Sequence, residues 1–267
     1  ATQRGEMPLR EIYERARDAD AQAAFGGVVV FNTTVDAATA EEIMQSIIEG
    51  VAAPAYEPEA LEILNNSDKY KKNKEIRVIK LPDFSVLPKY IDEGTNVFEI
   101  KVFDDGSVVL AQPYLSRVKG PEDLVPAYNE HKTKGRIDIA RKPTPAELDD
   151  LVFAWYINIH VRSNGVVIAK NGQTICVGTG EQDRVGAVLK ALSKAQDKYK
   201  GNETLEGAAM ASDGFFPFRD AVDAATSKGV RAIAQPGGSV NDYEAIEACN
   251  EVGATMVFTL ERCFSHH

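Results

Sequence analysis

The stretch VVIAKNGQTICVG, residues 166–178, constrains the fold more tightly than any other part of the sequence. It holds two apolar or alternating runs joined by a turn at Lys170-Asn171-Gly172. Asn-Gly is the dipeptide that a tight two-residue hairpin turn favours, because both turn positions take positive φ. The sequence therefore predicts an antiparallel strand pair here.

Segments typical of strands and helices alternate along both ends of the chain. The predicted strands are 25–31, 76–81, 230–234 and 255–259, and the predicted helices are 37–50, 58–64, 146–160, 184–198, 218–228 and 242–252. Asp36 is a predicted N-cap, and Thr144, Pro145 and Glu147 form a predicted capping box with proline in the first turn. This alternation predicts an α/β fold with a largely parallel layer.

The middle of the chain is less regular. Residues 96–110 carry two β-like runs around the turn at Asp104-Asp105-Gly106, and residues 111–142 mix proline, glycine and charge, which is typical of a crossover or an extended arm. We therefore expect two α/β halves, 1–110 and 143–267, separated by 111–142.

Composition excludes several classes of protein. The 267 residues contain no apolar run of about 18 residues, so we expect a soluble chain with no membrane partner. The net charge of −10 argues against nucleic acid, which requires a basic surface. Cys176, Cys249 and Cys263 form no CxxC pair, which favours a reducing, cytoplasmic location. No zinc-deaminase signature, P-loop or Gly-x-Ser-x-Gly elbow occurs, so we expect no metal site.

The segment SDGFFPFRDA, residues 212–221, gathers three phenylalanines around Pro217. With Asp213 as helix cap and Pro217 in the first turn, Phe215 and Phe216 fall in a loop. Such aromatic side chains either stack on a flat heteroaromatic ligand or fill a buried corner. The pattern leaves both readings open.

Three other segments are candidates for ligand contacts. Asn164, between a helix and the hairpin, either turns the backbone or holds a substrate through its amide. The Gly-rich stretch 178–184 opens a helix and is either an anion cradle or a plain loop; Asp183 stands where a dinucleotide fingerprint needs glycine. Arg262-Cys263-Phe264 follows the last strand, at the edge where α/β sheets bind ligands, and the final two histidines are either native or a tag remnant.

Taken in order, these motifs resemble one family. The segments are AAFGGVVVFN (23–32), APAYEPEAL (53–61), RSNGVVIAKNGQTICVGTGEQDR (162–184), MASDGFFPFRDAVDAA (210–225), GVRAIAQPGGSVNDYEAIEAC (229–249) and RCFSHH (262–267). Together they resemble the AICAR transformylase domain of the bifunctional purine-biosynthesis enzyme. The resemblance covers nearly the whole chain and is loose over about residues 66–140.

The resemblance implies transfer of a formyl group from 10-formyltetrahydrofolate to the amine of the ribotide AICAR, giving FAICAR in de novo purine (IMP) biosynthesis. It implies two cytidine-deaminase-like α/β subdomains without zinc, the first apparently truncated at its N-terminus, in a cytoplasmic homodimer. A monovalent cation such as potassium belongs to the same expectation.

Carried over residue by residue, the resemblance also implies a site. Asn164 matches the active-site asparagine, and Asp220 matches a residue that pairs with the pteridine edge. The ribotide side is matched by Phe25, Gly26, Phe215, Arg262 and Phe264, and the folate side by Val185, Gly214, Pro217 and Asp220.

The sequence departs from the family in one important respect. The family's acid–base pair lies in a Lys-His-x-Asn-Pro-Cys-Gly motif upstream of the segment that residues 9–27 resemble, and no Lys-His dipeptide occurs in this chain. An Arg-Tyr-Gly motif is likewise absent, and Glu49 and Glu181 replace the usual Asp and Gln. Three interpretations stay open. The first is a formyltransferase completed by a segment on another chain or otherwise missing here, and the second is a catalytically incomplete relative that binds ribotide or folate or acts as a dimerisation scaffold. The third is an unrelated α/β protein.

Overall fold

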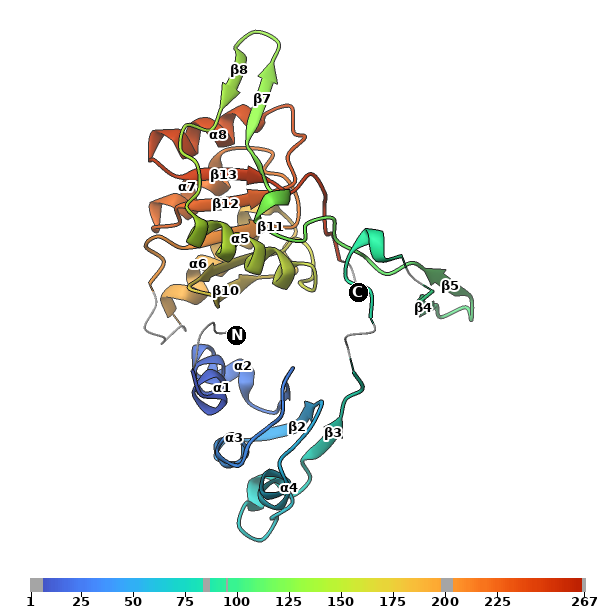
Figure 1. Cartoon of the computed structure of the whole chain (residues 1–267). Coiled ribbons are helices and arrows are strands. Elements are labelled where there is room, and N and C mark those ends of the chain that lie inside the picture. Colours follow the sequence, from blue (N-terminus) through green and yellow to red (C-terminus); the bar gives the residue numbers. More distant parts are fainter. Residues whose placement is uncertain (1–6, 84–86, 95, 198–203, 266–267) are drawn as a thin grey trace. The chain divides into compact units, whose positions relative to one another are not determined.

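The computed structural model describes residues 7–83, 87–94, 96–197 and 204–265 (Figure 1). The chain divides into two compact units: unit 1 comprises Ala1–Val86 and Gln196–Glu203, and unit 2 comprises Leu87–Ala195 and Thr204–His267. Each unit has its own hydrophobic core and its own sheets. The predicted α/β class is confirmed, while the assignment of 1–110, 111–142 and 143–267 to separate domains stays a prediction.

Unit 1 is a three-stranded parallel sheet with helices packed on one face. Its elements are α1 (Leu9–Ala19), α2 (Ala21–Ala24), β1 (Gly27–Val30), α3 (Ala37–Ile43), β2 (Ile48–Ala53), α4 (Pro58–Leu64), a 3-10 turn (Lys71–Asn73) and β3 (Arg77–Lys80), and the strand order is β1-β2-β3. Val51 at the centre of β2 packs with Tyr13, Ile43 and Leu64 from the three longest helices.

The helix predicted over 37–50 is shorter than expected. Asp36 does cap it, because the amide of Thr39 donates to Oδ1 of Asp36 at 2.7 Å. However, α3 ends at Ile43, and the apolar residues that follow form the central strand β2. Four successive residues of β2, Gly50 to Ala53, are buried, so the strand lacks the alternating pattern of a half-exposed strand and its apolar residues continue the helical pattern of α3.

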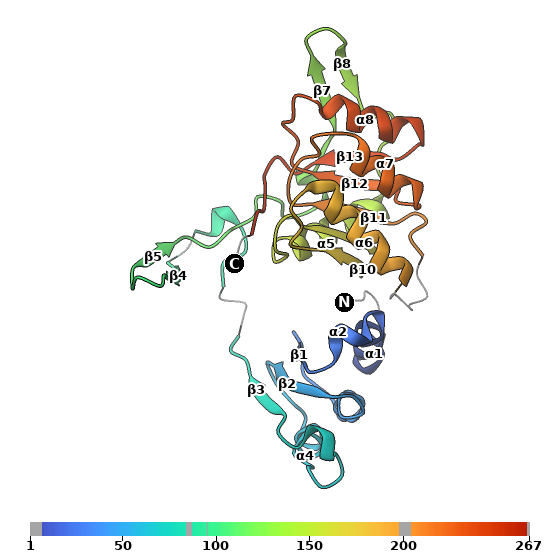
Figure 2. The ribbon, with the colours of Figure 1, turned by 180° about the vertical axis from the view of Figure 1, so that it is seen from behind.

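Unit 2 is built around a six-stranded mixed sheet. Its elements are a 3-10 turn (Ile91–Glu93), β4 (Glu99–Val102), β5 (Val108–Ala111), a 3-10 turn (Pro121–Asp123), β6 (Val125–Pro126), β7 (Tyr128–His131), β8 (Gly135–Asp138), α5 (Pro145–Asn158), β9 (Val166–Lys170), β10 (Gln173–Gly178), α6 (Arg184–Asp197), β11 (Ala209–Ser212), α7 (Asp220–Ser227), β12 (Ala232–Gln235), α8 (Asp242–Glu251) and β13 (Thr255–Phe258). The order is β10-β9-β11-β12-β13-β6, with β11, β12 and β13 parallel. Figure 2, from behind, shows α6, α7 and α8 over one face, and α5 covers the other.

Several local predictions in unit 2 are confirmed. Asn171 and Gly172 take φ of 54° and 69° at the tip of the β9–β10 hairpin. Thr144 and Glu147 form the reciprocal capping box of α5, with bonds of 3.2 and 2.8 Å. The irregular stretch 111–142 holds more structure than expected, because β6 joins the main sheet and β7 pairs with β8.

Candidate active site

The loops that carry the predicted ligand contacts meet at one end of the unit 2 sheet, where its parallel strands have their carboxyl ends. Strands β10, β11, β12 and β13 end at Gly178, Ser212, Gln235 and Phe258, and antiparallel β9 begins at Val166 on the same edge. Ligands of open α/β sheets commonly bind at the carboxyl ends of the strands. The term sheet edge refers below to this end of the unit 2 sheet.

A buried ion pair joins two of these loops. Arg184, the first residue of α6, donates through Nη1 to Oδ1 of Asp213, which directly follows β11, and both side chains are buried. The other carboxylate oxygen of Asp213 accepts from Oγ of Ser163 at 2.5 Å and from the amide of Gly165 at 2.9 Å. The buried charge is thus paired and hydrogen-bonded on both oxygens, the condition under which a buried ion pair is tolerated.

Asn164 is held between this ion pair and the Gly-rich loop. Its Oδ1 accepts from Nη2 of Arg184 at 2.8 Å, and its Nδ2 donates to the carbonyl of Glu181 at 2.9 Å. Its backbone amide donates to the same carbonyl at 3.1 Å. Asn164 therefore has a fixed amide orientation and is half-buried at the edge of the sheet.

The C-terminal tail is tied to the same network. The amide of Ser163 donates to the carbonyl of Ser265 at 2.8 Å, and the amide of Ser265 donates to Oγ of Ser163 at 3.0 Å. The amide of Cys263 donates to the carbonyl of Asp213 at 3.2 Å. Four segments that are far apart in the sequence thus converge. The final two histidines, His266 and His267, lie outside the described residues, so whether they are native or a tag remnant stays open.

Glu261 anchors the tail immediately before Arg262. Its carboxylate accepts from Oγ of Ser116 at 2.7 Å and from the amide of Arg117 at 3.0 Å. Ser116 in turn accepts from the indole of Trp155 in the core, at 3.2 Å. Hydrogen bonds that lead from buried Trp155 through Ser116 to Glu261 therefore fix the backbone directly before Arg262.

The predicted convergence of the aromatic loop and the tail arginine is confirmed. The guanidinium of Arg262 lies 4.9 Å from the ring centroid of Phe215 and 5.9 Å from that of Phe264. Gly214 leaves room for both Arg184 and Phe264, since a Cβ there would lie 2.4 Å from Nη2 of Arg184 and 2.6 Å from the Phe264 ring. Arg262 and Phe264 are exposed, and Phe215 is half-buried. The guanidinium of Arg262 thus lies beside two aromatic rings. A positive charge next to aromatic rings suits a flat, anionic ligand.

The aromatic loop fits one open reading at Phe216 and differs from expectation at Asp213. Phe216 is fully buried, so the loop is a buried corner there, whereas Phe215 is half-buried and lies against Arg262. Asp213 does not cap a helix; α7 begins later, at Asp220, and its cap residue Arg219 makes no side-chain capping bond. The reason is the buried Arg184, which requires the carboxylate of Asp213 as its partner.

The remaining predicted site residues are placed as follows. Val185 is the second residue of α6, Pro217 is half-buried in the loop before α7, and Asp220 is exposed with Oδ1 accepting from the amide of Ala221 at 2.8 Å. Phe25 and Gly26 belong to unit 1, where Phe25 is exposed and Gly26 has φ of 69°. The contacts of these residues with a ligand stay predictions.

Arg184 is the functional candidate that sequence reasoning missed. A cation in the first turn of a helix faces the positive end of the helix dipole, which disfavours it. An arginine at that position in the stretch Gly-Glu-Gln-Asp-Arg therefore signals a carboxylate partner elsewhere. The Ser-Asp-Gly of 212–214 supplies it.

The cysteines of unit 2 are unsuited to nucleophilic chemistry. Burial raises the pKa of Cys263, and the nearby carboxylates of Asp213 and Glu261 raise it further. Burial likewise raises the pKa of Cys176 and of Cys249 to about 12.

Two kinds of feature were not found among the residues that the structure describes. No group of three or more His, Cys, Asp or Glu side chains there could hold a metal ion. No described helix has the length and the apolar character that a membrane-spanning helix needs.

Comparison with known proteins identifies relatives. The family model described as AICARFT/IMPCHase bienzyme matches residues 4–194. The chain is 40% identical over 258 residues to the bifunctional purine biosynthesis protein PurH of Aquifex aeolicus (strain VF5), covering 97% of this chain and 44% of that relative. The proteins of the same name from Microcystis aeruginosa and Oceanobacillus iheyensis match with the same identity and coverage. The chain thus spans less than half the length of the curated relatives it matches.

Proposed function

The chain belongs to the AICARFT/IMPCHase bienzyme family, and we propose that it carries the formyl-transfer function: 10-formyltetrahydrofolate donates its formyl group to AICAR, giving FAICAR in IMP biosynthesis. One observation supports this most. Asn164, Arg262 and the Phe215 loop, matched separately to the family, are linked through the buried Arg184–Asp213 pair at one sheet edge.

The chemistry explains why such a site must be rigid. The amine of AICAR is a poor nucleophile, because its lone pair is delocalised into the imidazole ring and the carboxamide. As the amine attacks the formyl carbon, the nitrogen must lose a proton, an oxyanion develops on the formyl oxygen, and the bond to N10 of the folate then breaks. Holding two substrates in line supplies much of the rate.

We assign Asn164 a role at the reacting centre. Arg184 holds its Oδ1 and the Glu181 carbonyl holds one N–H, so the amide presents a defined donor edge without rearrangement. A preorganised amide donor of this kind stabilises developing negative charge. The Lys-His pair that performs acid–base work in the family would come from polypeptide outside this sequence.

Each of the two substrates is contacted by its own set of residues in this proposal. Phe215, Arg262 and Phe264 contact the ribotide in this proposal, and the guanidinium of Arg262 suits an anionic group. Phe25 and Gly26 of unit 1 stay predicted ribotide contacts from the resemblance alone. Val185, Gly214, Pro217 and Asp220 line the folate side, with the exposed Asp220 carboxylate pairing with the pteridine edge. The loop from 214 to 220 would separate the two ligands.

Assembly is part of the proposal. We expect two cytidine-deaminase-like subdomains, a cytoplasmic homodimer and a monovalent cation such as potassium. Size-exclusion chromatography with light scattering and a titration of activity with potassium test the last two.

The activity test uses the chain with AICAR and 10-formyltetrahydrofolate. We expect absent or very weak turnover from the chain alone, and turnover once a polypeptide carrying the Lys-His motif is added. Asn164→Ala should then remove most of the rate, whereas the exposed Asn65→Ala should not. Normal turnover by the chain alone would contradict the assignment of the acid–base pair.

The site assignment is tested by binding. Arg262→Ala should weaken ribotide binding more than folate binding, because its guanidinium lies in the aromatic cluster. Arg136→Ala is the matched control, since that arginine also lies over an aromatic ring, 4.7 Å from the centroid of Tyr128. The reverse order of effects would contradict the assignment of the two sets of residues.

A second candidate is a catalytically incomplete relative that binds ribotide or folate, or acts as a dimerisation scaffold. It is favoured by the absence of a Lys-His dipeptide from the sequence. Ligand binding without turnover, unchanged by any added Lys-His polypeptide, would support it over the enzyme.

A further inference from the structure

The Gly-rich loop of residues 178–184 supplies one of the two contacts that orient the amide of Asn164. The carbonyl of Glu181 accepts from the backbone amide of Asn164 at 3.1 Å and from its Nδ2 at 2.9 Å. The other contact comes from Nη2 of Arg184 at 2.8 Å, and Arg184 is fixed by its buried pairing with Asp213. The core therefore holds one side of the amide, while the other side depends on what holds the loop.

The loop is tied first to the residue two positions before Asn164. The amide of Gly180 donates to the carbonyl of Arg162 at 2.9 Å, and Oγ1 of Thr179 donates to the same carbonyl at 3.1 Å. Both Gly180 and Arg162 are exposed. Since water competes for hydrogen bonds at exposed positions, these two bonds restrain the loop only weakly.

Lys190 adds a second attachment, from the helix that follows the loop. It lies in α6, and its Nζ donates to the carbonyl of Thr179 at 3.2 Å and to Oε1 of Glu181 at 2.5 Å. Side chains of a helix point back towards its N-terminus, so Lys190 can reach the loop that precedes α6. One ammonium group thereby joins two residues of the loop to the helix.

The two acceptors of Lys190 lie on either side of Gly180. Gly180 has φ of 68°, a region that glycine adopts readily, and glycine has more backbone freedom than any other residue. Rotation at Gly180 would move the carbonyl of Glu181 away from Asn164. The bonds from Lys190 span this glycine, and a bond between an ammonium and a carboxylate is stronger than one between neutral groups.

We infer that Lys190 and Glu181 are positioning residues for the amide of Asn164. The ammonium of Lys190 holds the loop across Gly180, the loop places the carbonyl of Glu181, and that carbonyl directs the donor edge of Asn164. This inference rests on the proposed function, because that function assigns Asn164 to the reacting centre.

The alternative is an ion pair that serves stability alone. The side chains of Lys190 and Glu181 are 41% and 32% exposed, and those of the Lys134–Glu247 pair in the same unit are 44% and 38% exposed. Pairs as exposed as these contribute little to stability. The loss of either pair should therefore affect folding to the same small extent, and only the loss of the first should affect Asn164.

Hydrogen exchange at the backbone amide of Asn164 measures its bond to Glu181 in the full chain, without substrate. Lys190→Met removes the ammonium and keeps a long side chain, so we expect exchange at Asn164 to accelerate at least about 10-fold. Glu181→Gln should accelerate it less, because a neutral acceptor replaces the carboxylate. Lys134→Met is the matched control, since Lys134 pairs with Glu247 at 3.0 Å, and it should leave exchange at Asn164 unchanged.

Turnover separates positioning from stability. The assay contains AICAR, 10-formyltetrahydrofolate and the added polypeptide that carries the Lys-His motif. Lys190→Met should lower kcat about 10-fold and leave KM nearly unchanged, because a displaced donor edge weakens contacts that form in the transition state. The urea midpoint from Trp155 fluorescence should match that of Lys134→Met.

Three results would overturn the inference. The first is exchange at Asn164 that is as slow in Lys190→Met as in wild type, and the second is an equal loss of kcat in Lys134→Met. The third is a fall in the urea midpoint of Lys190→Met large enough to account for the faster exchange, which would make the pair structural. Because the exchange measurement contains no substrate, it decides the role of Lys190 even if the wild type shows no turnover, a result that would contradict the proposed function instead.

Discussion

Replacing Asp213 with asparagine removes the negative charge from the centre of the candidate site. The side chain keeps its size, and one oxygen can still accept from Ser163 and Gly165. The guanidinium of Arg184 loses its counter-ion while remaining buried, with only the carbonyl of Gly165 and the amide oxygen of Asn164 as acceptors.

The expected cost follows from that geometry. Removing one partner of a buried ion pair typically costs about 3–5 kcal/mol, because an uncompensated charge stays behind. That is a large part of the roughly 5–15 kcal/mol by which a domain is stable. With a urea m-value of about 2 kcal/mol/M, the unfolding midpoint should fall by about 2 M.

A single tryptophan makes the measurement specific to unit 2. Trp155 is the one tryptophan of the sequence and is fully buried in the unit 2 core, so its fluorescence reports the unfolding of that unit. Asp223→Asn is the matched control, since Asp223 pairs with Arg219 at 2.8 Å on the exposed surface, where such a pair contributes at most about 1 kcal/mol. If Asp213→Asn costs no more than this control, the reasoning about the buried pair is wrong.

Two further changes test other parts of unit 2. Gly214→Ala should displace the Phe264 ring and the buried guanidinium of Arg184, because a Cβ there would lie 2.6 Å and 2.4 Å from them, and it should cost about 1–3 kcal/mol together with ribotide affinity. Urea unfolding and calorimetry measure the two effects. Gly186→Ala, in the helix α6, should cost less, because the added Cβ would meet the exposed carboxylate of Asp183 at 3.0 Å, and equal effects of the two variants would contradict the packing argument. Burial alone would raise the pKa of Glu147, but bonds from Arg141 and the cap of α5 outweigh it and lower the pKa. The stabilisation by Glu147 is therefore fully present at neutral pH and begins to be lost as pH falls below about 4.5, so the difference in unfolding free energy between wild type and Glu147→Gln should narrow as the pH is lowered further. A difference as large at pH 3 as at pH 7 would contradict this.

The sequence predicted local features well where one short motif determines the geometry. The Asn171-Gly172 turn, the Thr144 capping box and the cap at Asp36 all appear as expected, because each depends on residues within a few positions. The predicted end of α3 was wrong, since the burial of successive β2 residues arises from their central place in the sheet and leaves no alternating pattern in the local sequence.

In the candidate site, too, some features were predicted correctly from the sequence and others were not. The aromatic loop and the tail arginine were expected to meet, and the distance of 4.9 Å between Arg262 and Phe215 agrees. The pairing of Arg184 with Asp213 was not foreseen, because two residues 29 positions apart become partners only when α6 and the end of β11 are placed side by side. Local rules assigned Asp213 to a helix cap, and the tertiary demand of a buried cation took precedence.

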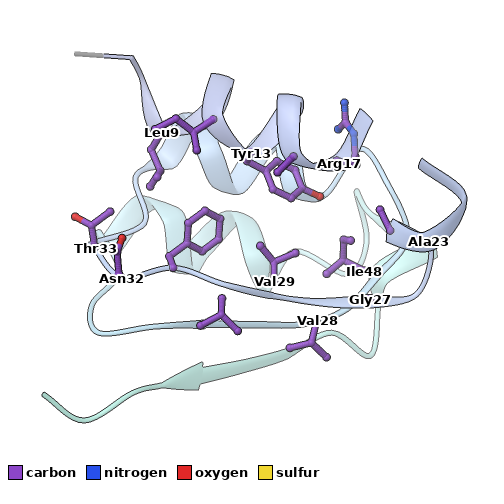
Figure 3. A pocket seen from close by; sticks show the side chains of 15 residues that line it. Leu9, Tyr13, Arg17, Ala23, Gly27, Val28, Val29, Asn32, Thr33 and Ile48 are labelled. Carbon is purple, nitrogen blue, oxygen red and sulfur yellow. The ribbon is translucent and has the colours of Figure 1, made fainter. Parts of the chain in front are cut away.

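Unit 2 combines a fully buried apolar strand with a buried network of charged and polar side chains at the end of that strand. In unit 2 the apolar faces of β11 are fully covered, so the sheet edge can carry a charged, hydrogen-bonded network without exposing the core. In unit 1, Val28 and Val30 of β1 (Figure 3) are 63% and 64% exposed, and Phe25, which lies two residues before β1, is exposed as well. An exposed aromatic ring is free to stack on a flat ligand, so Phe25→Ala should weaken ribotide binding without a loss of stability. Calorimetry with the ribotide measures the first effect and urea unfolding the second. An unchanged affinity for the ribotide would remove Phe25 from the proposed site.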